Sequence, residues 1–269
     1  MLNTALQGVI QGLTEFLPVS SSGHLTLFQF FTGRTNLEAN MQTDIAVHFG
    51  TLIAVIFYFR NDLMPFFTLS GWKNAETRRI AMLVIAASIP TAALGIGFKK
   101  QFEALFASPA SVCLFLFLTG ILLLVSEKLK QKTSTHQNIA ELSYARAATI
   151  GFVQGLAITP GISRSGSTIG AGLIAGLDGE AAAKFSFFLM IPAVSGATLL
   201  EAKKLLESTA APATSSTELV IGATVAAITG FAALKLLVYM IKKQKLSIFA
   251  YYLFIVSISS FIAINFLGK

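Results

Sequence analysis

Long apolar runs alternate along this chain with short polar connections. The runs at 80–98, 104–126 and 246–268 contain no charged residue, and a helix needs about 20 mainly apolar residues to cross a bilayer. Shorter apolar runs at 45–59, 185–200 and 219–234 adjoin Arg60, Lys184 and Lys235, whose long side chains can reach the membrane surface. The pattern predicts six membrane-spanning helices.

Two more apolar segments, 3–30 and 146–176, are interrupted in the middle by Pro, Gly and Ser. Their centres align without gaps, as GVIQGLTEFLPVSSSG at 8–23 and GFVQGLAITPGISRSG at 151–166. Chance would give about one match over this length. The identical pairs are Gly8/Gly151, Gln11/Gln154, Gly12/Gly155, Leu13/Leu156, Ser20/Ser163, Ser22/Ser165 and Gly23/Gly166. Each copy is predicted to form a helix, a break near Pro18 or Pro160, and a second helix that begins in a serine-rich turn.

Each half of the chain holds one broken segment followed by three spans, so the repeats are expected at 1–130 and 145–269. Because three crossings is an odd number, the second half should lie upside down if each broken segment re-enters on its own side. The predicted fold is one all-α integral membrane domain, 1–269, with six transmembrane helices, two re-entrant helix–loop–helix segments and an inverted-topology repeat. Paired broken helices of this kind typically place a polar site at the repeat interface.

Composition agrees with a membrane protein. The chain is 54% hydrophobic and 12% charged, about half the charged share of a typical soluble domain. The net charge of +7 does not indicate a nucleic-acid partner, because Lys and Arg gather in the predicted loops. No positively charged region precedes the first apolar segment, so no cleavable signal peptide is expected. Membrane lipids are the expected surroundings.

Loop charges predict the orientation in the membrane, because cytoplasmic loops carry an excess of Lys and Arg. One set of loops and span ends holds Arg60, Lys73, Arg78, Arg79, Lys128, Lys130, Lys132, Arg146, Lys184, Lys242, Lys243 and Lys245. The other, smaller set holds Arg34, Lys99, Lys100, Lys203, Lys204 and Lys269. The larger set is predicted to face the cytoplasm, and both termini the outside.

The first candidate functional residue is a carboxylate, Glu15, within the first broken segment. Gln11 lies four residues earlier, so the two side chains share a helix face. An ionisable residue deep in an apolar segment is expensive and is a functional candidate by default. The alternative, a helix-end Glu paired with a basic residue, finds no Lys or Arg nearby in sequence. In the following span, Asp44 is expected to act as a starting cap and His48 to have a packing or supporting role.

A serine cluster follows Pro18 and opens the next helix. Ser20, Ser21 and Ser22 can cap that helix, and the free N–H groups of a helix N-terminus bind anions. His24 lies three residues after Ser21, so both side chains can face one pocket. Capping alone for the serines and a buried core position for the histidine are the plain alternatives. A carboxylate, a hydroxyl and an imidazole together at one break favour a functional site.

Arg164 opens the second restart, at the position that matches Ser21. Its planar guanidinium can bind two phosphate oxygens at once; the alternative is an arginine that extends to the membrane surface. The combined set supplies a nucleophile, a base and groups that stabilise an oxyanion. A site within the membrane predicts a lipid-tailed phosphate substrate. The residues expected to bind its phosphates are Ser20, Ser22, Ser163, Ser165 and Thr168.

Three stretches carry a family resemblance: QGLTEFLPVSSSGH at 11–24, PGISRSGST at 160–168 and FSFFLMIPA at 185–193. They closely resemble the undecaprenyl-pyrophosphate phosphatase family of the bacitracin-resistance (BacA) type, and the resemblance covers essentially the whole chain. It implies hydrolysis of undecaprenyl pyrophosphate to undecaprenyl phosphate and inorganic phosphate, which recycles the lipid carrier of peptidoglycan synthesis. It also implies location in the bacterial plasma membrane, a site open to the outer face, and dependence on a divalent cation, Mg²⁺ or Ca²⁺.

The resemblance carries over residue by residue. The family's first motif has Glu or Gln, three residues, then Glu; here these are Gln11 and Glu15, the expected cation ligands, with one carboxylate instead of two. The catalytic serine, histidine and arginine map to Ser21, His24 and Arg164. The expected mechanism is attack by Ser21 with His24 as general base, while Glu15 orients His24 or holds the cation. Attack by His24 itself stays open.

A lipid-phosphate flippase or an anion transporter is the rival interpretation, because inverted repeats with broken helices are a transporter architecture. Such a protein would need the arginine but no nucleophile, so the combination of Ser21 and His24 favours an enzyme. A purely structural membrane subunit is disfavoured, because buried Glu, His and Arg would destabilise it without a function.

Overall fold

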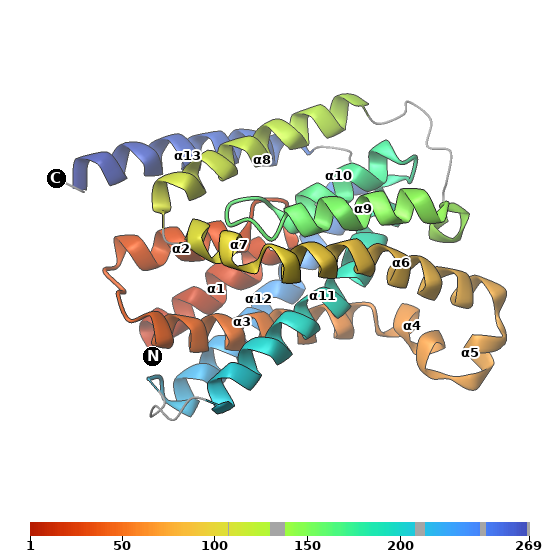
Figure 1. Ribbon diagram of the computed structural model, residues 1–269, viewed down its shortest axis with the longest axis horizontal. Helices are drawn as coiled ribbons and strands as arrows, with labels where there is room; N and C mark the ends of the chain where they lie inside the picture. Colours follow the sequence, from red (N-terminus) through yellow and green to blue (C-terminus); the bar gives the residue numbers. More distant parts are fainter. Residues whose placement is uncertain (107, 130–137, 208–212, 243–245, 268–269) are drawn as a thin grey trace.

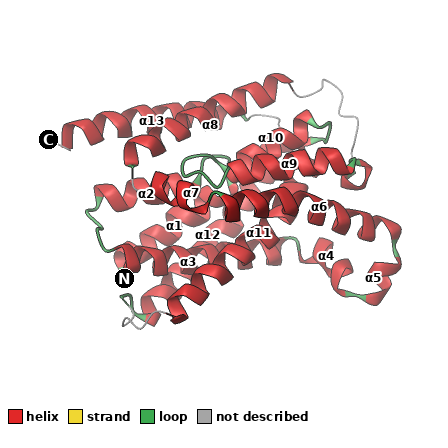
Figure 2. Cartoon of the chain, viewed as in Figure 1, coloured by secondary structure: helices red, strands yellow, loops and turns green. Residues whose placement is uncertain are grey.

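The computed structural model describes residues 1–106, 108–129, 138–207, 213–242 and 246–267. Within these ranges the chain consists of helices joined by turns, with no strand (Figure 2). Six of the described helices are long and apolar enough to cross a membrane, which confirms the predicted number. They are α3 (Leu37–Tyr58), α6 (Ala75–Gly97), α8 (Pro109–Leu129), α11 (Gly179–Glu207), α12 (Ser216–Lys242) and α13 (Ser247–Leu267).

Both broken segments form two helices around a break, as their sequences predict. The first comprises α1 (Leu2–Phe16) and α2 (Ser21–Phe31), and the second α9 (Tyr144–Leu156) and α10 (Arg164–Ile174). At the first break Leu17 is extended (φ −63°, ψ 146°), as expected for a residue that precedes proline. At the second, Gly161 has φ +92°, which glycine alone adopts readily. A Cβ there would also lie 2.6 Å from the carbonyl oxygen of Val112.

The first span, α3, begins earlier than its hydropathy suggests. Asn36 caps it, because the Asn36 side chain accepts a hydrogen bond from the Ala39 N–H at 3.0 Å. Asp44 therefore lies inside the helix, and the prediction that Asp44 caps it is wrong. Hydropathy misplaced the boundary because the first turns of α3 are polar. The shorter elements are α4 (Arg60–Leu63), η1 (Met64–Phe67), α5 (Leu69–Lys73), α7 (Lys99–Phe106) and η2 (Ile139–Glu141).

The first helix of each broken segment packs against a span from the other half of the chain. Helix α1 lies along α12, which also packs on α3, and α9 lies along α6. Gly12 permits the close approach of α1 and α12, since a Cβ there would lie 1.9 Å from Oγ1 of Thr229. Helices α8 and α13 run side by side at one edge of the molecule, and α10 packs on α8 and α11 (Figure 1).

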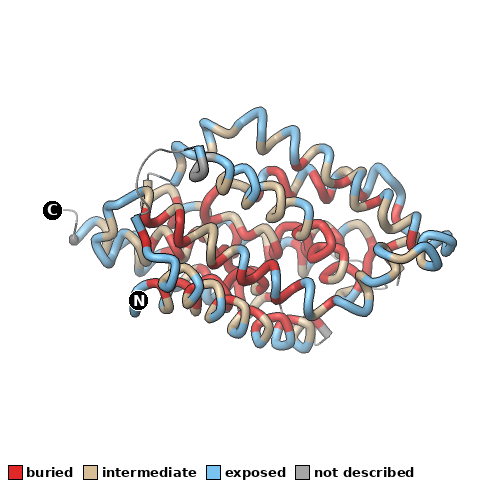
Figure 3. Tube along the Cα trace, turned by 90° about the horizontal axis from the view of Figure 1, so that it is seen from below, coloured by how far each residue is buried: buried red, intermediate tan, exposed pale blue. Residues whose placement is uncertain are grey.

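Buried residues gather along the middle of the bundle, while the helix ends and outer faces are exposed (Figure 3). The exposed faces of the spans are strongly apolar, as lipid contact requires; Ile89, Ile228 and Ile255 are examples. Gln11, Glu15 and many hydroxyl side chains are instead buried. Many polar groups of the spans and broken segments thus face inward, and Gln11 and Glu15 lie close to the first break.

The start of α1 and the end of α13 lie at one end of the molecule, away from α4 and α5 (Figure 1). This placement agrees with the predicted location of both termini on one side of the membrane. The orientation itself stays a prediction. Of the residues used for it, Lys130, Lys132, Lys243, Lys245 and Lys269 lie outside the described residues.

Candidate active site

The two breaks contact each other in the interior, although 148 residues of sequence separate them. The Ser165 hydroxyl donates to the carbonyl oxygen of Leu17 at 3.0 Å, and Arg164 Nη2 donates to Glu15 Oε1 at 2.6 Å. The second break is also anchored to α8, because Thr119 Oγ1 donates to the Gly161 carbonyl at 2.9 Å. The repeat thus brings the two helix N-termini, α2 and α10, to one place.

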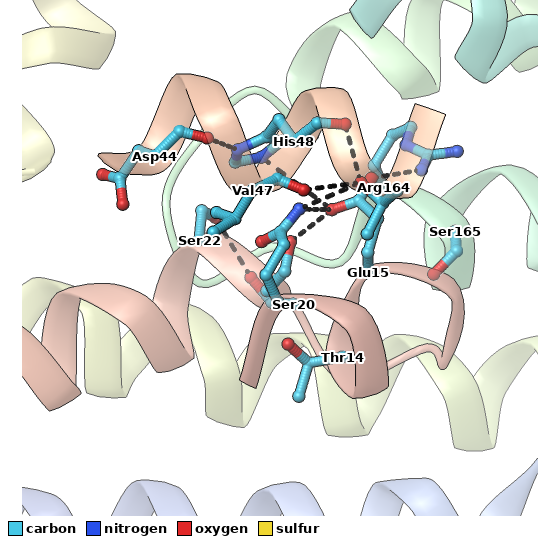
Figure 4. Close-up of polar contacts among 12 residues, drawn as sticks. Thr14, Glu15, Ser20, Ser22, Asp44, Val47, His48, Arg164 and Ser165 are labelled. Atoms are coloured by element: carbon cyan, nitrogen blue, oxygen red, sulfur yellow. Dashed lines mark hydrogen bonds and ion pairs between the residues drawn. The ribbon is translucent and has the colours of Figure 1, made fainter. Parts of the chain in front are cut away.

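Glu15 is the centre of this arrangement (Figure 4). Its Oε2 accepts hydrogen bonds from Ser21 Oγ at 2.5 Å and from Gln11 Nε2 at 3.1 Å, while Oε1 accepts from Arg164. The Glu15 side chain is 6% exposed and the Arg164 side chain 15%. A charge so deeply buried is tolerated only when it is paired and hydrogen-bonded, and both conditions hold here.

His48 of α3 also belongs to this cluster, although the sequence predicted only a packing or supporting role for it. Its Nε2 lies 3.9 Å from Glu15 Oε2. Its Nδ1 lies 2.7 Å from the Asp44 carbonyl oxygen; that oxygen can only accept, so Nδ1 carries the hydrogen and Nε2 faces the carboxylate. The Asp44 carboxylate points away from the cluster (Figure 4) and accepts from Gln29 Nε2 at 3.0 Å. One signal was readable: polar residues recur at helical spacing on this otherwise apolar span, at Asn40, Asp44, His48 and Thr51.

The structure does not pair His24 with Ser21. His24 Nδ1 lies 2.8 Å from the Ser20 carbonyl oxygen, and Nε2 lies 2.8 Å from the Tyr252 hydroxyl on α13. The Ser21 hydroxyl donates to Glu15 instead. The expected Ser21–His24 hydrogen bond and the expected contact between Glu15 and His24 are therefore absent from the described contacts. The cause is local, because Ser20 has φ +68° and directs its carbonyl to the His24 backbone N–H and ring.

The hydroxyl groups expected to bind phosphate also have structural partners. Ser20 Oγ accepts from the Gly23 N–H at 3.3 Å, and Ser163 Oγ from the Gly166 N–H at 3.1 Å, so both serines cap helices. Ser22 and Ser165 lie within hydrogen-bond distance of these two capping hydroxyls. Thr168 Oγ1 lies 2.6 Å from Ser186 Oγ. Their binding of phosphate stays a prediction.

Two buried polar atoms of the cluster have no protein partner. They are Arg164 Nη1, a donor, and Gln11 Oε1, an acceptor. Buried polar groups are nearly always hydrogen-bonded, so these atoms suit a ligand: a phosphate oxygen for the arginine, and a hard cation for the Gln11 amide oxygen. No three His, Cys, Asp or Glu residues gather as a metal site in the part of the chain that the structure describes. A cation held by Gln11 and Glu15 would therefore take most of its oxygens from substrate or water.

Comparison with known proteins identifies the family. The family model described as bacitracin resistance protein BacA matches residues 4–259. The chain belongs to the BacA family. Similar proteins include the undecaprenyl-diphosphatase of Halothermothrix orenii, 43% identical over 251 residues that cover 93% of each chain. The undecaprenyl-diphosphatase of Desulfatibacillum aliphaticivorans is 40% identical, with 97% of this chain and 98% of the relative covered. That of Methanobrevibacter smithii is also 40% identical, with 97% and 96% covered.

Membership of the BacA family agrees with the resemblance seen in the sequence motifs. Two of those motifs, at 11–24 and 160–168, lie at the two breaks, and the third, at 185–193, lies within α11. The side chains that meet at the breaks, Glu15, Ser21 and Arg164, come from the first two motifs. The family assignment and the buried cluster thus point to the same region of the molecule.

Proposed function

We propose that this protein hydrolyses undecaprenyl diphosphate to undecaprenyl phosphate and inorganic phosphate, and so recycles the lipid carrier of peptidoglycan synthesis. The observation that carries the proposal is the buried cluster in which one carboxylate, Glu15, holds the Ser21 hydroxyl and the Arg164 guanidinium. A hydroxyl that is hydrogen-bonded to a carboxylate is a recognisable activated nucleophile, and the similar proteins are named undecaprenyl-diphosphatases.

The geometry supports Ser21 as the nucleophile and Glu15 as its base. Ser21 Oγ would form a bond to the terminal phosphorus as its proton moves to Glu15 Oε2, 2.5 Å away. The bond from that phosphorus to the bridging oxygen breaks, and undecaprenyl phosphate leaves with the electron pair. A water then attacks the phosphorus of phosphoserine, and the bond between that phosphorus and Ser21 Oγ breaks as Glu15 returns its proton to Oγ. One proton of the water passes to the freed carboxylate and from there to solvent, and inorganic phosphate leaves.

Arg164 would hold the transferring phosphoryl group through Nη1, which has no protein partner. Protonation of Glu15 would also weaken its ion pair with Arg164, so the guanidinium becomes available as charge builds on the phosphate. A divalent cation, Mg²⁺ or Ca²⁺, held by Gln11 Oε1 and Glu15, would neutralise charge on the phosphate oxygens. Attack by His24 is the less favoured variant, because both of its ring nitrogens are engaged.

The same proposal includes the finer topology. The packing of α1 on α12 and of α9 on α6 supports an inverted repeat with two re-entrant segments. In both cases the first helix of one half packs against a span of the other half. Helices α1–α2 and α9–α10 are too short to cross the membrane and return as full spans. We infer that the protein lies in the bacterial plasma membrane with its site open to the outer face, in line with the orientation that the loop charges predict.

Release of inorganic phosphate in detergent tests the function, since a flippase or transporter has no compartments to act between there. Purified protein should release phosphate from a polyprenyl diphosphate, and Ser21→Ala should lose at least about a hundredfold in turnover. Ser88→Ala on α6 is the control, because the Ser88 hydroxyl donates to the Val84 carbonyl of its own helix at 2.8 Å and belongs to neither break. It should stay within a few fold of the wild type. Phosphate release equal to a protein-free blank would exclude the enzyme and leave the transporter.

A further inference from the structure

Tyr252 of α13 bonds to His24 of α2, and no sequence motif pointed to it. The Tyr252 hydroxyl lies 2.8 Å from His24 Nε2, and the two rings are nearly parallel, with an interplanar angle of 5° and centroids 5.7 Å apart. No other hydrogen bond joins α2 to α13 among the described residues. The last span of the chain is thus tied to the serine-rich turn through one side chain.

Hydrogen-bond chemistry fixes which nitrogen of His24 carries the hydrogen. The Ser20 carbonyl oxygen can only accept, so Nδ1, 2.8 Å away, must donate to it. In the neutral ring Nε2 is then an acceptor, and the Tyr252 hydroxyl donates to it. The two contacts select one tautomer and one orientation of the imidazole.

The same contacts reach the nucleophilic turn. Ser20 is the one non-glycine residue with positive φ in the described chain, at +68°, a conformation that costs about 1–3 kcal/mol and persists only when its surroundings hold it. Its carbonyl accepts from the His24 backbone N–H at 3.2 Å as well as from Nδ1. Ser21, which must stay 2.5 Å from Glu15, is the next residue.

We propose that Tyr252 is a positioning residue: its hydroxyl locks the His24 imidazole, and through the Ser20 carbonyl it holds the strained turn that presents Ser21 to Glu15. The proposal rests on the proposed function. Without the hydroxyl, the imidazole can rotate or change tautomer, the Ser20 carbonyl loses its second donor, and Ser21 spends less time against the carboxylate. We therefore expect loss of the Tyr252 hydroxyl to lower turnover and to leave substrate affinity unchanged.

A role as a membrane anchor is the competing explanation, because Tyr is enriched at membrane surfaces. The chain offers a matched control for it in the adjacent Tyr251. Tyr251 is 61% exposed and has no hydrogen bond among the described contacts. Both residues lie in the same turn of α13, so an anchoring role would make their hydroxyl groups equivalent.

The first experiment compares Tyr252→Phe with Tyr251→Phe in purified, folded protein. Loss of one neutral hydrogen bond should lower kcat of Tyr252→Phe by about 3- to 10-fold, with KM within twofold of the wild type and Tyr251→Phe unchanged. The Tyr252→Phe substitution should then have no further effect in a His24→Ala background. A full additional loss in that background, or a rise of KM with unchanged kcat, would overturn the proposal.

The second experiment does not depend on activity. The chain has three histidines, so ¹⁵N labelling with His24→Ala as a reference assigns the ring signals of His24. The wild type should show His24 with the hydrogen on Nδ1, and Tyr252→Phe a mixture of tautomers. An unchanged tautomer in Tyr252→Phe would overturn the positioning role even if the protein is an active phosphatase. If Tyr252→Phe shows the mixture of tautomers but the wild type releases no phosphate, the proposed function is wrong and the positioning of His24 by Tyr252 stands.

Discussion

Replacement of Glu15 by Gln separates the charge of the carboxylate from its volume. The wild-type carboxylate accepts from Ser21, Gln11 and Arg164 and lies 3.9 Å from His48 Nε2. A Gln side chain of the same size offers one acceptor oxygen and one amide donor. If the oxygen stays on Arg164, the amide donor faces Ser21 and Gln11 Nε2, so neither of these donors has an acceptor and Ser21 loses its base.

Two magnitudes follow from this geometry. The Arg164 side chain is 15% exposed, and removal of one partner from a buried pair costs about 3–5 kcal/mol because the remaining charge is uncompensated. A missing general base lowers turnover by about 10²- to 10⁴-fold. Glu15→Gln should therefore be both less stable and almost inactive, whereas a role in binding alone would raise KM and leave kcat intact.

The assay combines phosphate release at saturating substrate with denaturation in the same detergent. Glu127→Gln is a suitable control, because Glu127 is a partly buried glutamate near the end of α8 whose carboxylate accepts from the Ser247 backbone N–H at 2.7 Å. It should lose some stability and keep its turnover. Cation is raised to millimolar levels in a parallel series, so that weakened metal binding is not mistaken for loss of the base.

Turnover of Glu15→Gln within tenfold of the wild type would refute Glu15 as the proton acceptor. Full recovery at high cation would mean that Glu15 is a replaceable metal ligand. Wild-type stability in the variant would contradict the inferred energetic coupling between Glu15 and Arg164.

Three more predictions concern the same site and its orientation. Arg164→Lys keeps the charge but loses the planar guanidinium, so kcat should fall about 10²- to 10³-fold. Near-normal phosphate release would mean that Arg164 acts only through its positive charge. Chelator should abolish activity, and Gln11→Glu should lower the cation concentration needed for half-maximal rate, because a second carboxylate joins Glu15; an unaffected wild type would rule out the metal. Cysteine placed at Lys100 should react with a membrane-impermeant thiol reagent in intact cells and cysteine at Lys73 only after permeabilisation, and the reverse result would invert the topology.

The helices and the location of the breaks follow from the amino-acid sequence alone. A helix closes its backbone hydrogen bonds within a few residues of itself, and lipid offers no other partner for these groups. Uncharged runs such as 104–126 therefore had to become spans, and Pro18 and Gly161 had to interrupt helices. The repeat also placed Ser21 and Arg164 at matching positions. The boundary of α3 was missed because a polar first turn resembles a loop when only hydropathy is considered.

Which side chains meet depends on how the helices pack in three dimensions. Arg164 reaches Glu15 across 149 positions, and Tyr252 reaches His24 across 228, and no local pattern encodes either pairing. The sequence interval between Ser21 and His24 suggested a pair, but the left-handed backbone of Ser20 turned the imidazole toward α13 and left the hydroxyl to Glu15. Spacing along a helix tells which residues share a face. Which partner that face receives depends on how distant helices pack, because a buried charge or donor takes whichever complementary group the packing brings within reach.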